Sequence, residues 1–398
     1  MGYLEDFNLL NELYTEEKEL IQIPGSDIKI KNYNFTSDES KYYPETDYFS
    51  NSLQKKLSLL SDSALRSKSF LEKTAEAESY NTKFMYPVYS KPGKSKKLVI
   101  LFHGLNEGGW EKYHSWAKKL VELTGRTVLS FPISHHINRR PKNWIASRTM
   151  NALGKERQKS FGAKECSFLN SAISTRLHLM PETFFWSGLR SFHDVQKLIS
   201  QVRSGSFSEI DRDCSISLFG YSIGAFLIET LIMAKQEMFA DSKAVLFCGG
   251  STMDLMSFTS KFICDSTAEK SIMDFYVDNF ENEIQKNEHL KKYFTENEED
   301  GMVYRSLLNM HRFADFRVSR LKKFEEQVLA ITLKCDDVVP TTSVTKTLTE
   351  KGLNIIINEM HFPIEYDHVL PFPIGEKIKE ETNKCFEQVF SAAADWLE

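Results

Sequence analysis

The sequence predicts an α/β protein with a mostly parallel, doubly wound sheet and helices on both of its faces. Several short runs are apolar on successive residues, as strands buried on both faces of a parallel sheet must be. Between these runs lie stretches with apolar residues at three- and four-residue intervals, the spacing of amphipathic helices that cross from one strand to the next. Alternation of the two patterns is typical of this fold class.

The elements follow one another along the chain without internal repeats. Strands are predicted at residues 28–35, 83–88, 98–102, 127–132, 215–220, 244–248, 328–335 and 353–359. Crossover helices are predicted at residues 110–124, 189–203, 223–238 and 374–398. Residues 1–82 are more polar, and we expect them to form a peripheral strand and helix wrapped on the core.

Two gaps between predicted strands are too long for a single crossover. Two segments, residues 134–214 and 251–327, each span roughly 80 residues, against a usual crossover of about 10–15. We therefore expect a core of residues 83–250 and 328–398, with an insertion at about 134–188. Residues 251–327 carry Phe, Met and Leu at helical spacing, which predicts a helical cap over one end of the sheet, above the site described below.

Composition excludes several classes of protein. The 398 residues include 50 basic and 55 acidic side chains, a formal net charge of −5, so no basic field exists to attract nucleic acid. No window approaches the roughly 18 apolar residues of a membrane span, and the acidic N-terminus is unlike a signal peptide. We expect a cytoplasmic protein, although a removed signal peptide would leave the same sequence. The six cysteines lack metal-site spacing, which favours reduced thiols without a metal or cofactor.

One segment carries a motif of nucleophilic catalysis. A predicted strand ends in Gly220-Tyr221-Ser222-Ile223-Gly224, and a predicted helix follows directly. This G-x-S-x-G pattern between strand and helix exposes the serine on a turn so sharp that the flanking positions need glycine. The alternative is a glycine-rich turn in which Ser222 only caps the helix. We expect Ser222 to be the nucleophile.

A serine nucleophile needs a base and an orienting carboxylate, and the chain has candidates for both downstream. Asp336 and Asp337 follow a late strand, before Pro340, and His368 precedes the last helix. In these motifs and their order the sequence resembles the α/β-hydrolase superfamily, serine hydrolase branch, from about residue 84 to the C-terminus. The resemblance implies a catalytic triad of Ser222, Asp336 and His368. Asp337 is the alternative acid, and His361 is the alternative base.

The resemblance also indicates where the reaction's oxyanion is bound. One donor is expected to be the N–H of Ile223, next to the nucleophile. The second is expected to be the N–H of Leu105, in the loop His103-Gly104-Leu105-Asn106, where the superfamily carries an HG element. The side chain of Asn106 is the less favoured alternative. His103 and Tyr221 are further expected to contact substrate.

A basic loop follows the predicted strand 127–132. It contains His135, His136, Arg139 and Arg140 within six residues. Loops at the carboxyl ends of parallel strands face the ligand crevice, and arginine matches the geometry of carboxylate and phosphate oxygens. We therefore expect these four residues to bind an anionic part of the substrate. An ordinary basic surface loop that compensates nearby carboxylates is the more common meaning of such a run of residues. A metal site is disfavoured because adjacent histidines rarely face one ion.

Together these features predict a cofactor-independent serine hydrolase acting on a small-molecule ester, thioester or amide through an acyl-enzyme. Two alternatives remain open: an acyltransferase that uses the same triad, and a catalytically silent binding protein with the hydrolase fold.

Overall fold

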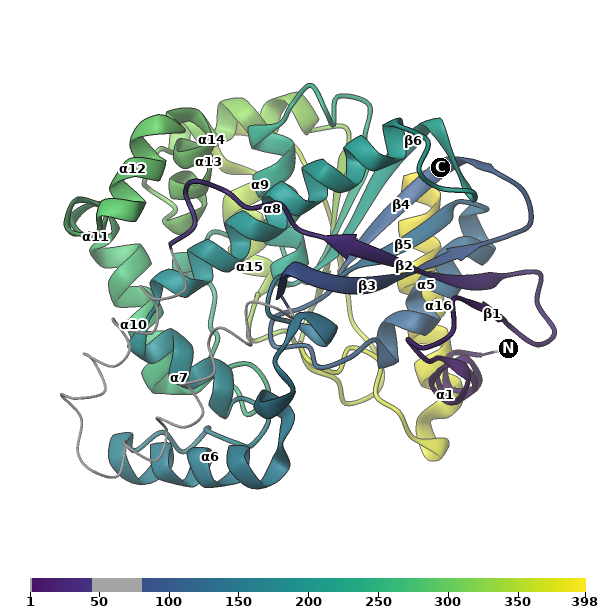
Figure 1. Cartoon of the computed structure of the whole chain (residues 1–398), viewed down its shortest axis with the longest axis horizontal. Coiled ribbons are helices and arrows are strands. Elements are labelled where there is room, and N and C mark those ends of the chain that lie inside the picture. Colours follow the sequence, from purple (N-terminus) through teal and green to yellow (C-terminus); the bar gives the residue numbers. More distant parts are fainter. Residues whose placement is uncertain (1, 45–80) are drawn as a thin grey trace.

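The computed structural model describes residues 2–44 and 81–398. Within these residues nine strands form one sheet in the order β1-β2-β3-β5-β4-β6-β7-β8-β9 (Figure 1). The strands are β1 (Leu20–Gln22), β2 (Lys29–Thr36), β3 (Lys83–Ser90), β4 (Ser95–Phe102), β5 (Thr127–Phe131), β6 (Ile210–Tyr221), β7 (Ala244–Phe247), β8 (Val328–Leu333) and β9 (Ile356–Met360).

The strand directions confirm the predicted mostly parallel sheet. From β5 through β4 and on to β9 all neighbours are parallel, whereas β1, β2 and β3 join by antiparallel pairing. Each predicted strand overlaps an observed one, and the predicted α/β class is confirmed. The short strand β1 was not predicted, and β2 pairs with β3 along its whole length. The N-terminal segment therefore extends the sheet, while predictions for residues 45–80 lie outside the described part.

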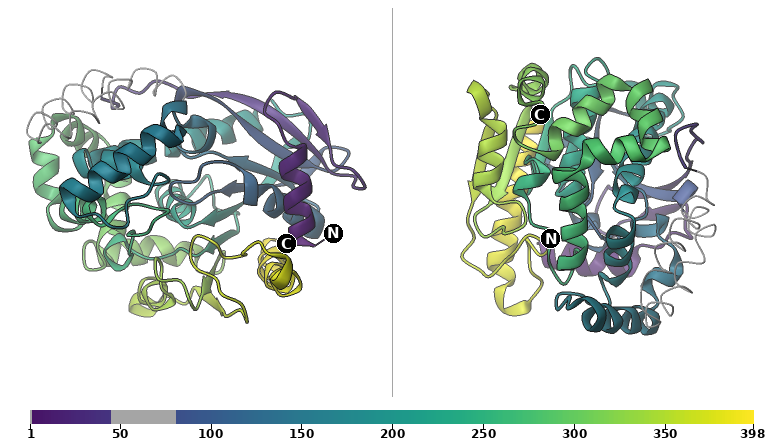
Figure 2. Two further views of the ribbon diagram at one scale, coloured as in Figure 1. Left: turned by 90° about the horizontal axis from the view of Figure 1, so that it is seen from below. Right: turned by 90° about the vertical axis from the view of Figure 1, so that its left-hand side faces the viewer.

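Helices cover both faces of the sheet (Figure 2). Alternate residues of β4 separate the two faces: Val99 and Leu101 pack toward α1, α5 and α16, whereas Leu98 and Ile100 pack toward α8, α9 and α15. These helices are α1 (Tyr3–Leu13), α5 (Glu111–Thr124), α8 (Glu182–Arg203), α9 (Ile223–Ala234), α15 (Thr341–Leu348) and α16 (Lys379–Leu397). The last helix begins five residues later than predicted, after a short 3-10 turn, η8 (Glu376–Ile378).

The two long insertions are largely helical. The first holds η2 (Ile137–Arg139), η3 (Lys142–Ile145), α6 (Ser147–Phe161) and α7 (Ser171–Leu179). The second holds η4 (Met253–Leu255), α10 (Ser266–Ile272), the π-helical η5 (Met273–Asp278), α11 (Phe280–Lys286), α12 (Glu288–Glu296), α13 (Glu298–Leu308), α14 (Ala314–Leu321) and η6 (Lys322–Phe324). Both lie on the left of Figure 1, beyond the carboxyl ends of the parallel strands.

A buried ion pair joins the two insertions. Arg157 of α6 bonds both carboxylate oxygens of Asp265 at 2.6 and 2.8 Å, and Asp265 also caps α10. Both side chains are buried, so water does not compete with this bidentate pair. The pair therefore holds α6 of the first insertion against the start of α10 in the second. No helix in the described part of the chain combines the length and the apolar character needed to cross a membrane.

Candidate active site

Ser222 occupies a sharp turn between β6 and α9. Its backbone has φ 56° and ψ −115°, a conformation that costs a non-glycine residue free energy. A Cβ on Gly220 would lie 2.5 Å from the backbone of Gly224, and one on Gly224 would lie 2.7 Å from Phe102. Only glycine fits at both flanking positions, so the turn requires the G-x-S-x-G sequence.

Three side chains from separate loops form a continuous series of hydrogen bonds. Nε2 of His368 lies 2.8 Å from Oγ of Ser222, and Nδ1 of His368 lies 2.7 Å from Oδ2 of Asp336. Oδ1 of Asp336 accepts further hydrogen bonds from the N–H groups of Val338 and Val339 at 3.0 and 2.7 Å. His368 and Asp336 are 2% and 4% exposed, which shields the pair from competing water.

The sheet explains why these residues meet. Ser222 follows β6, Asp336 follows β8 and His368 lies in the loop after β9, all at the carboxyl edge of the parallel strands. The alternatives named from the sequence lie elsewhere: Asp337 is exposed, and His361 contacts the hydroxyl of Tyr366 at 2.9 Å.

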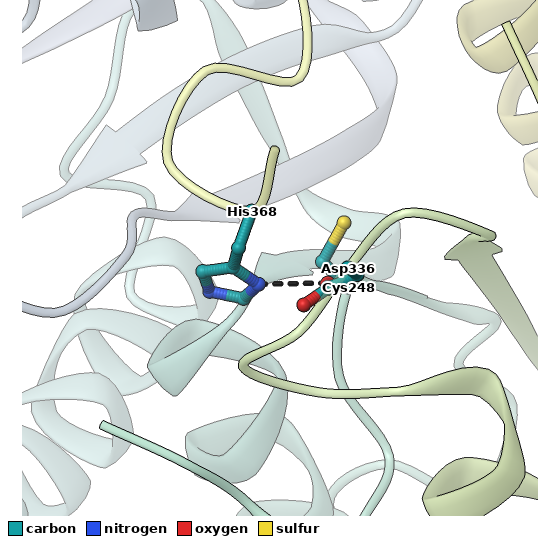
Figure 3. Close-up of side chains that lie close together, drawn as sticks. All are labelled: Cys248, Asp336 and His368. Carbon is teal, nitrogen blue, oxygen red and sulfur yellow. Dashed lines mark hydrogen bonds and ion pairs between the residues drawn. The ribbon is translucent and has the colours of Figure 1, made fainter. Parts of the chain in front are cut away.

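Cys248, which the sequence analysis did not identify as a site residue, lies beside Asp336 and His368 (Figure 3). Cys248 follows β7 with φ 50°, and its sulfur lies within 4.8 Å of ligand atoms of Asp336 and His368. Burial, with the nearby Asp336 carboxylate, raises the pKa of the thiol well above its usual value. The sulfur therefore stays protonated, and a thiol is a poor metal ligand compared with a thiolate. No local motif marks this residue; only its position at the end of a buried strand does.

Two residues that line the small cavity at Ser222, Leu105 and Ile223, have backbone N–H groups without a partner among the described residues. Among the described residues, no acceptor bonds the N–H of Ile223 or that of Leu105. The side chain of Asn106, the alternative donor, is committed elsewhere: its amide donates to the carbonyls of Leu169 at 3.0 Å and Phe262 at 2.6 Å. Asn106 thereby ties together one residue from each insertion.

His103 and Tyr221 have structural partners. His103 is fully buried; its Nδ1 lies 2.8 Å from the carbonyl of Gly104, and its Nε2 accepts from the N–H of Ile133 at 2.8 Å. Burial holds its pKa well below the usual value, so the ring is neutral. The structure does not bring His103 to the cavity at Ser222, and both of its ring nitrogens are paired within the protein. Tyr221 donates its hydroxyl to the carbonyl of His368, although its ring lines the cavity.

The basic loop after β5 also departs from expectation. Arg139 is fully buried, with its guanidinium 2.7 Å from Asp194 and bonded to the carbonyls of Asn81 and Pro132. The structure does not bring Arg139 to the cavity at Ser222, and these partners within the protein occupy its donors. His135 contacts Ser187 at 3.1 Å and stacks on Trp144. Trp144 lines the cavity at Ser222, whereas His135 is not among its lining residues.

Arg140 is the member of this loop that lines the cavity containing Ser222. One of its nitrogens donates to the carbonyl of Gly108 at 3.3 Å, and the charges of Glu107 and Glu111 lie near it. His136 lines a different cavity, between α8 and α9.

The cavity over Ser222 holds about 770 Å³ including the solvent at its mouth. Its rim is apolar: Ile145, Phe168, Leu169 and Phe262 are 56%, 44%, 43% and 41% exposed and come from both insertions. A smaller apolar cavity adjoins Ser222 and includes Met256, Phe258 and Ile263. The residues of 251–327 that line these two cavities thus belong to the irregular stretch before α10, whereas α12 and α13 face α8 and α9.

Comparison with solved structures finds distant likenesses. Carboxyl esterase 2 of the mycorrhizal fungus Tuber melanosporum has 13% identity and a TM-score of 0.45 over 80% of this chain and 82% of its own. A thermostable esterase from Pseudomonas putida ECU1011 has 10% identity and a TM-score of 0.47 over 100% and 91%. An esterase of Pyrobaculum calidifontis has 11% identity and a TM-score of 0.42 over 90% and 94%.

At the level of sequence, no curated protein matches this chain. A family model matches it over residues 1–398, and its description is "Family of unknown function (DUF6051)". The protein belongs to the DUF6051 family.

Proposed function

We propose that the protein is a serine hydrolase that cleaves an ester, thioester or amide through an acyl-enzyme on Ser222. The hydrogen-bonded series from Ser222 through His368 to Asp336 is the observation that carries the proposal. It supplies a nucleophile, a base within reach of the nucleophile's proton, and a buried carboxylate that fixes the orientation of the base.

In the first half-reaction, Nε2 of His368 takes the proton of Ser222 as Oγ bonds to the acyl carbon. Asp336, bonded to Nδ1, holds the ring in place and stabilises the imidazolium that forms. His368 then gives the proton to the leaving oxygen, sulfur or nitrogen, and that atom's bond to the acyl carbon breaks. Water repeats the sequence in the second half-reaction and releases the acid and free Ser222.

The oxyanion formed in each half-reaction needs donors fixed in advance. We assign this role to the N–H groups of Ile223 and Leu105, which have no other acceptor in the described part of the chain. Removing one such donor from an enzyme typically costs about 2.7–4 kcal/mol of transition-state stabilisation.

We further propose that the two insertions act together as the cap of the site. Support comes from the apolar rim, to which each insertion contributes, and from Asn106, which bonds a carbonyl of each. An apolar rim favours substrates with an apolar group beside the scissile bond. Arg140, at the same cavity, is the proposed contact for a polar part of the substrate.

The test is reaction with a fluorophosphonate probe, followed by peptide mapping of the adduct. Ser222 is expected to carry the adduct, and Ser222→Ala is expected to lose labelling and turnover of a panel of nitrophenyl esters. Ser206→Ala, at an exposed serine, is the matched control and should behave like the unmodified protein. An adduct on another residue, or turnover by Ser222→Ala, would contradict the proposal.

Product analysis separates the alternatives. Transfer of the acyl group to added alcohol in preference to water indicates an acyltransferase, whereas a labelled but inert Ser222 indicates a binding protein.

A further inference from the structure

A second cavity lies behind the proposed oxyanion donors. It is bounded by α8, α9, α12, α13 and the turn after β5, and it holds about 710 Å³ counted with the solvent at its mouth. Its lining is mainly aromatic and aliphatic, including Phe184, Phe185, Leu189, Phe192, Leu227 and Tyr293. The mechanism proposed above makes no use of this space.

The second cavity is next to the reacting atoms. Leu105 and Ile223, the residues assigned to the oxyanion, both line it. Phe226 also lines it, and these three residues also line the small apolar cavity that contains Ser222. Leu105, Ile223 and Phe226 therefore form a wall shared by the second cavity and the small cavity at Ser222.

Most polar side chains of the lining are already paired. Asp300 binds Lys235 at 2.7 Å, Thr230 donates to the carbonyl of Phe226 at 2.9 Å, and Ser191 donates to the carbonyl of Ser187 at 2.9 Å. Nε2 of His136 is a buried polar atom of the lining that lacks a partner among the described residues. Unpaired buried polar atoms are costly, and one adjoining an empty apolar cavity indicates a ligand that pairs with it.

The hydrogen-bonding role of His136 follows from its neighbours. Nδ1 lies 2.9 Å from the carbonyl oxygen of Ser134, which can only accept, so Nδ1 carries the proton. Burial lowers the pKa of His136 to about 4, so the ring is neutral at physiological pH. Nε2 is therefore an acceptor and needs a donor such as a hydroxyl or an N–H group.

We infer that the second cavity is the subsite for an apolar arm of the substrate, and that this arm carries a hydrogen-bond donor which binds Nε2 of His136. The inference rests on the proposed function and specifies its substrate class: acyl compounds with an apolar, hydroxyl- or amide-bearing chain. The side chains of Leu105, Ile223 and Phe226 must move aside for the arm to enter, and rotamer changes of this kind are common on binding.

Gly188 offers a clean way to fill the cavity. It lies within α8, it lines the cavity, and a Cβ at this position meets no atom within 4 Å. Replacing a glycine inside a helix also improves helix propensity, so Gly188→Leu should fold. Gly188→Ala makes the same backbone change while adding one methyl group, and it serves as the matched control.

The first experiment compares two 4-nitrophenyl phosphonates, one with a methyl and one with an octyl group on phosphorus. Release of nitrophenol gives the rate, and mapping shows whether Ser222 is modified. Gly188→Leu is expected to lower the octyl-to-methyl rate ratio by roughly 10- to 200-fold, the range for lost apolar contacts in a pocket. Gly188→Ala should stay near the unmodified protein.

The second experiment uses octyl probes with and without a hydroxyl group at successive chain positions. One of the hydroxylated probes is expected to react about 5-fold faster than the unsubstituted octyl probe. This is the effect of one ordinary hydrogen bond, here to Nε2 of His136. His136→Phe should abolish this preference, so that the hydroxylated probe and octyl react at the same rate.

The outcomes distinguish a failure of the proposed subsite from a failure of the proposed hydrolase function. If Gly188→Leu slows both probes equally, or if no hydroxylated probe depends on His136, the subsite is wrong while Ser222 labelling still supports the hydrolase. If neither probe modifies Ser222 in the unmodified protein, the proposed function itself fails, and the subsite fails with it.

Discussion

The hydroxyl of Tyr221 donates a hydrogen bond to the backbone carbonyl of His368, and the two rings stack with centroids 5.6 Å apart. Tyr221 directly precedes Ser222, so the turn that presents the serine also holds the loop that carries the histidine. A second tie comes from α5, where the ammonium of Lys112 lies 4.6 Å from the centre of the Tyr221 ring and donates to the carbonyl of Val369 at 3.1 Å.

The first prediction concerns this tie. Tyr221→Phe keeps the stacked ring but leaves the carbonyl of His368 without its donor, so we expect kcat to fall about 5- to 10-fold with KM nearly unchanged, the effect of about 1 kcal/mol. Steady-state kinetics on a nitrophenyl ester give both constants. Tyr366→Phe, whose hydroxyl contacts His361, is the matched control. An equal fall in kcat in both variants would contradict a specific role of the Tyr221 hydroxyl in positioning His368.

The second prediction assigns the base and its carboxylate. His368→Ala and Asp336→Asn should each lower kcat by roughly 10³- to 10⁴-fold or more, because the proton of Ser222 then lacks an oriented acceptor. Thermal unfolding should show that both variants fold.

The controls for this prediction are the residues that sequence alone left as alternatives. His361→Ala and Asp337→Asn should retain activity within a few-fold, since neither joins the series of hydrogen bonds at Ser222. If the His361 and Asp337 variants lost activity while the His368 and Asp336 variants kept it, His361 would be the base and Asp337 the acid.

Local patterns in the sequence were enough to predict the parallel sheet and the turn at Ser222. Buried strands read as unbroken apolar runs, and the turn requires glycine at positions two residues on either side of Ser222, so both signals lie within a few neighbouring residues. The three-residue strand β1 gives too short a signal, because two of its residues, Leu20 and Gln22, are exposed.

Contacts between distant segments could not be predicted in the same way. Arg139 pairs with Asp194, which lies 55 residues away on α8, and nothing in the loop itself indicates that pairing. Cys248 adjoins Asp336 only because β7 and β8 are neighbours in the sheet. The cavity behind Leu105 and Ile223 depends on how α12 and α13 pack against α8 and α9, which helical periodicity alone does not determine.

The third prediction replaces the expected ligand role of Arg139 with a structural one. Arg139→Ala leaves the buried carboxylate of Asp194 uncompensated, so we expect the free energy of unfolding to fall by roughly 3–5 kcal/mol. Urea denaturation measures the loss. Arg140→Ala, at a partly exposed neighbour, should change stability by much less. A stable Arg139→Ala variant with a raised KM for acidic esters would restore the role first inferred from the sequence.

The last prediction concerns Glu229, on the helix that begins after Ser222. Its side chain is fully buried, neither carboxylate oxygen has a partner among the described residues, and burial raises its pKa to about 8 against the opposing charge of Arg317. In the unfolded chain the same group titrates near its ordinary value of about 4.3. Between these two pKa values the folded protein holds a proton that the unfolded protein releases, so this group's contribution to stability is full at acid pH and is lost as pH rises toward 8.

Glu229→Gln removes the titration while keeping the shape of the side chain. The variant should therefore gain stability relative to the unmodified protein as pH increases, by up to about 1.4 kcal/mol per pH unit across this window. Urea denaturation at pH 5, 7 and 9 gives the difference directly, and Glu237→Gln, at an exposed carboxylate near the same helix, controls for the change of charge. Parallel stability curves for the unmodified protein and Glu229→Gln would show that the carboxylate is ionised and solvated in the folded state.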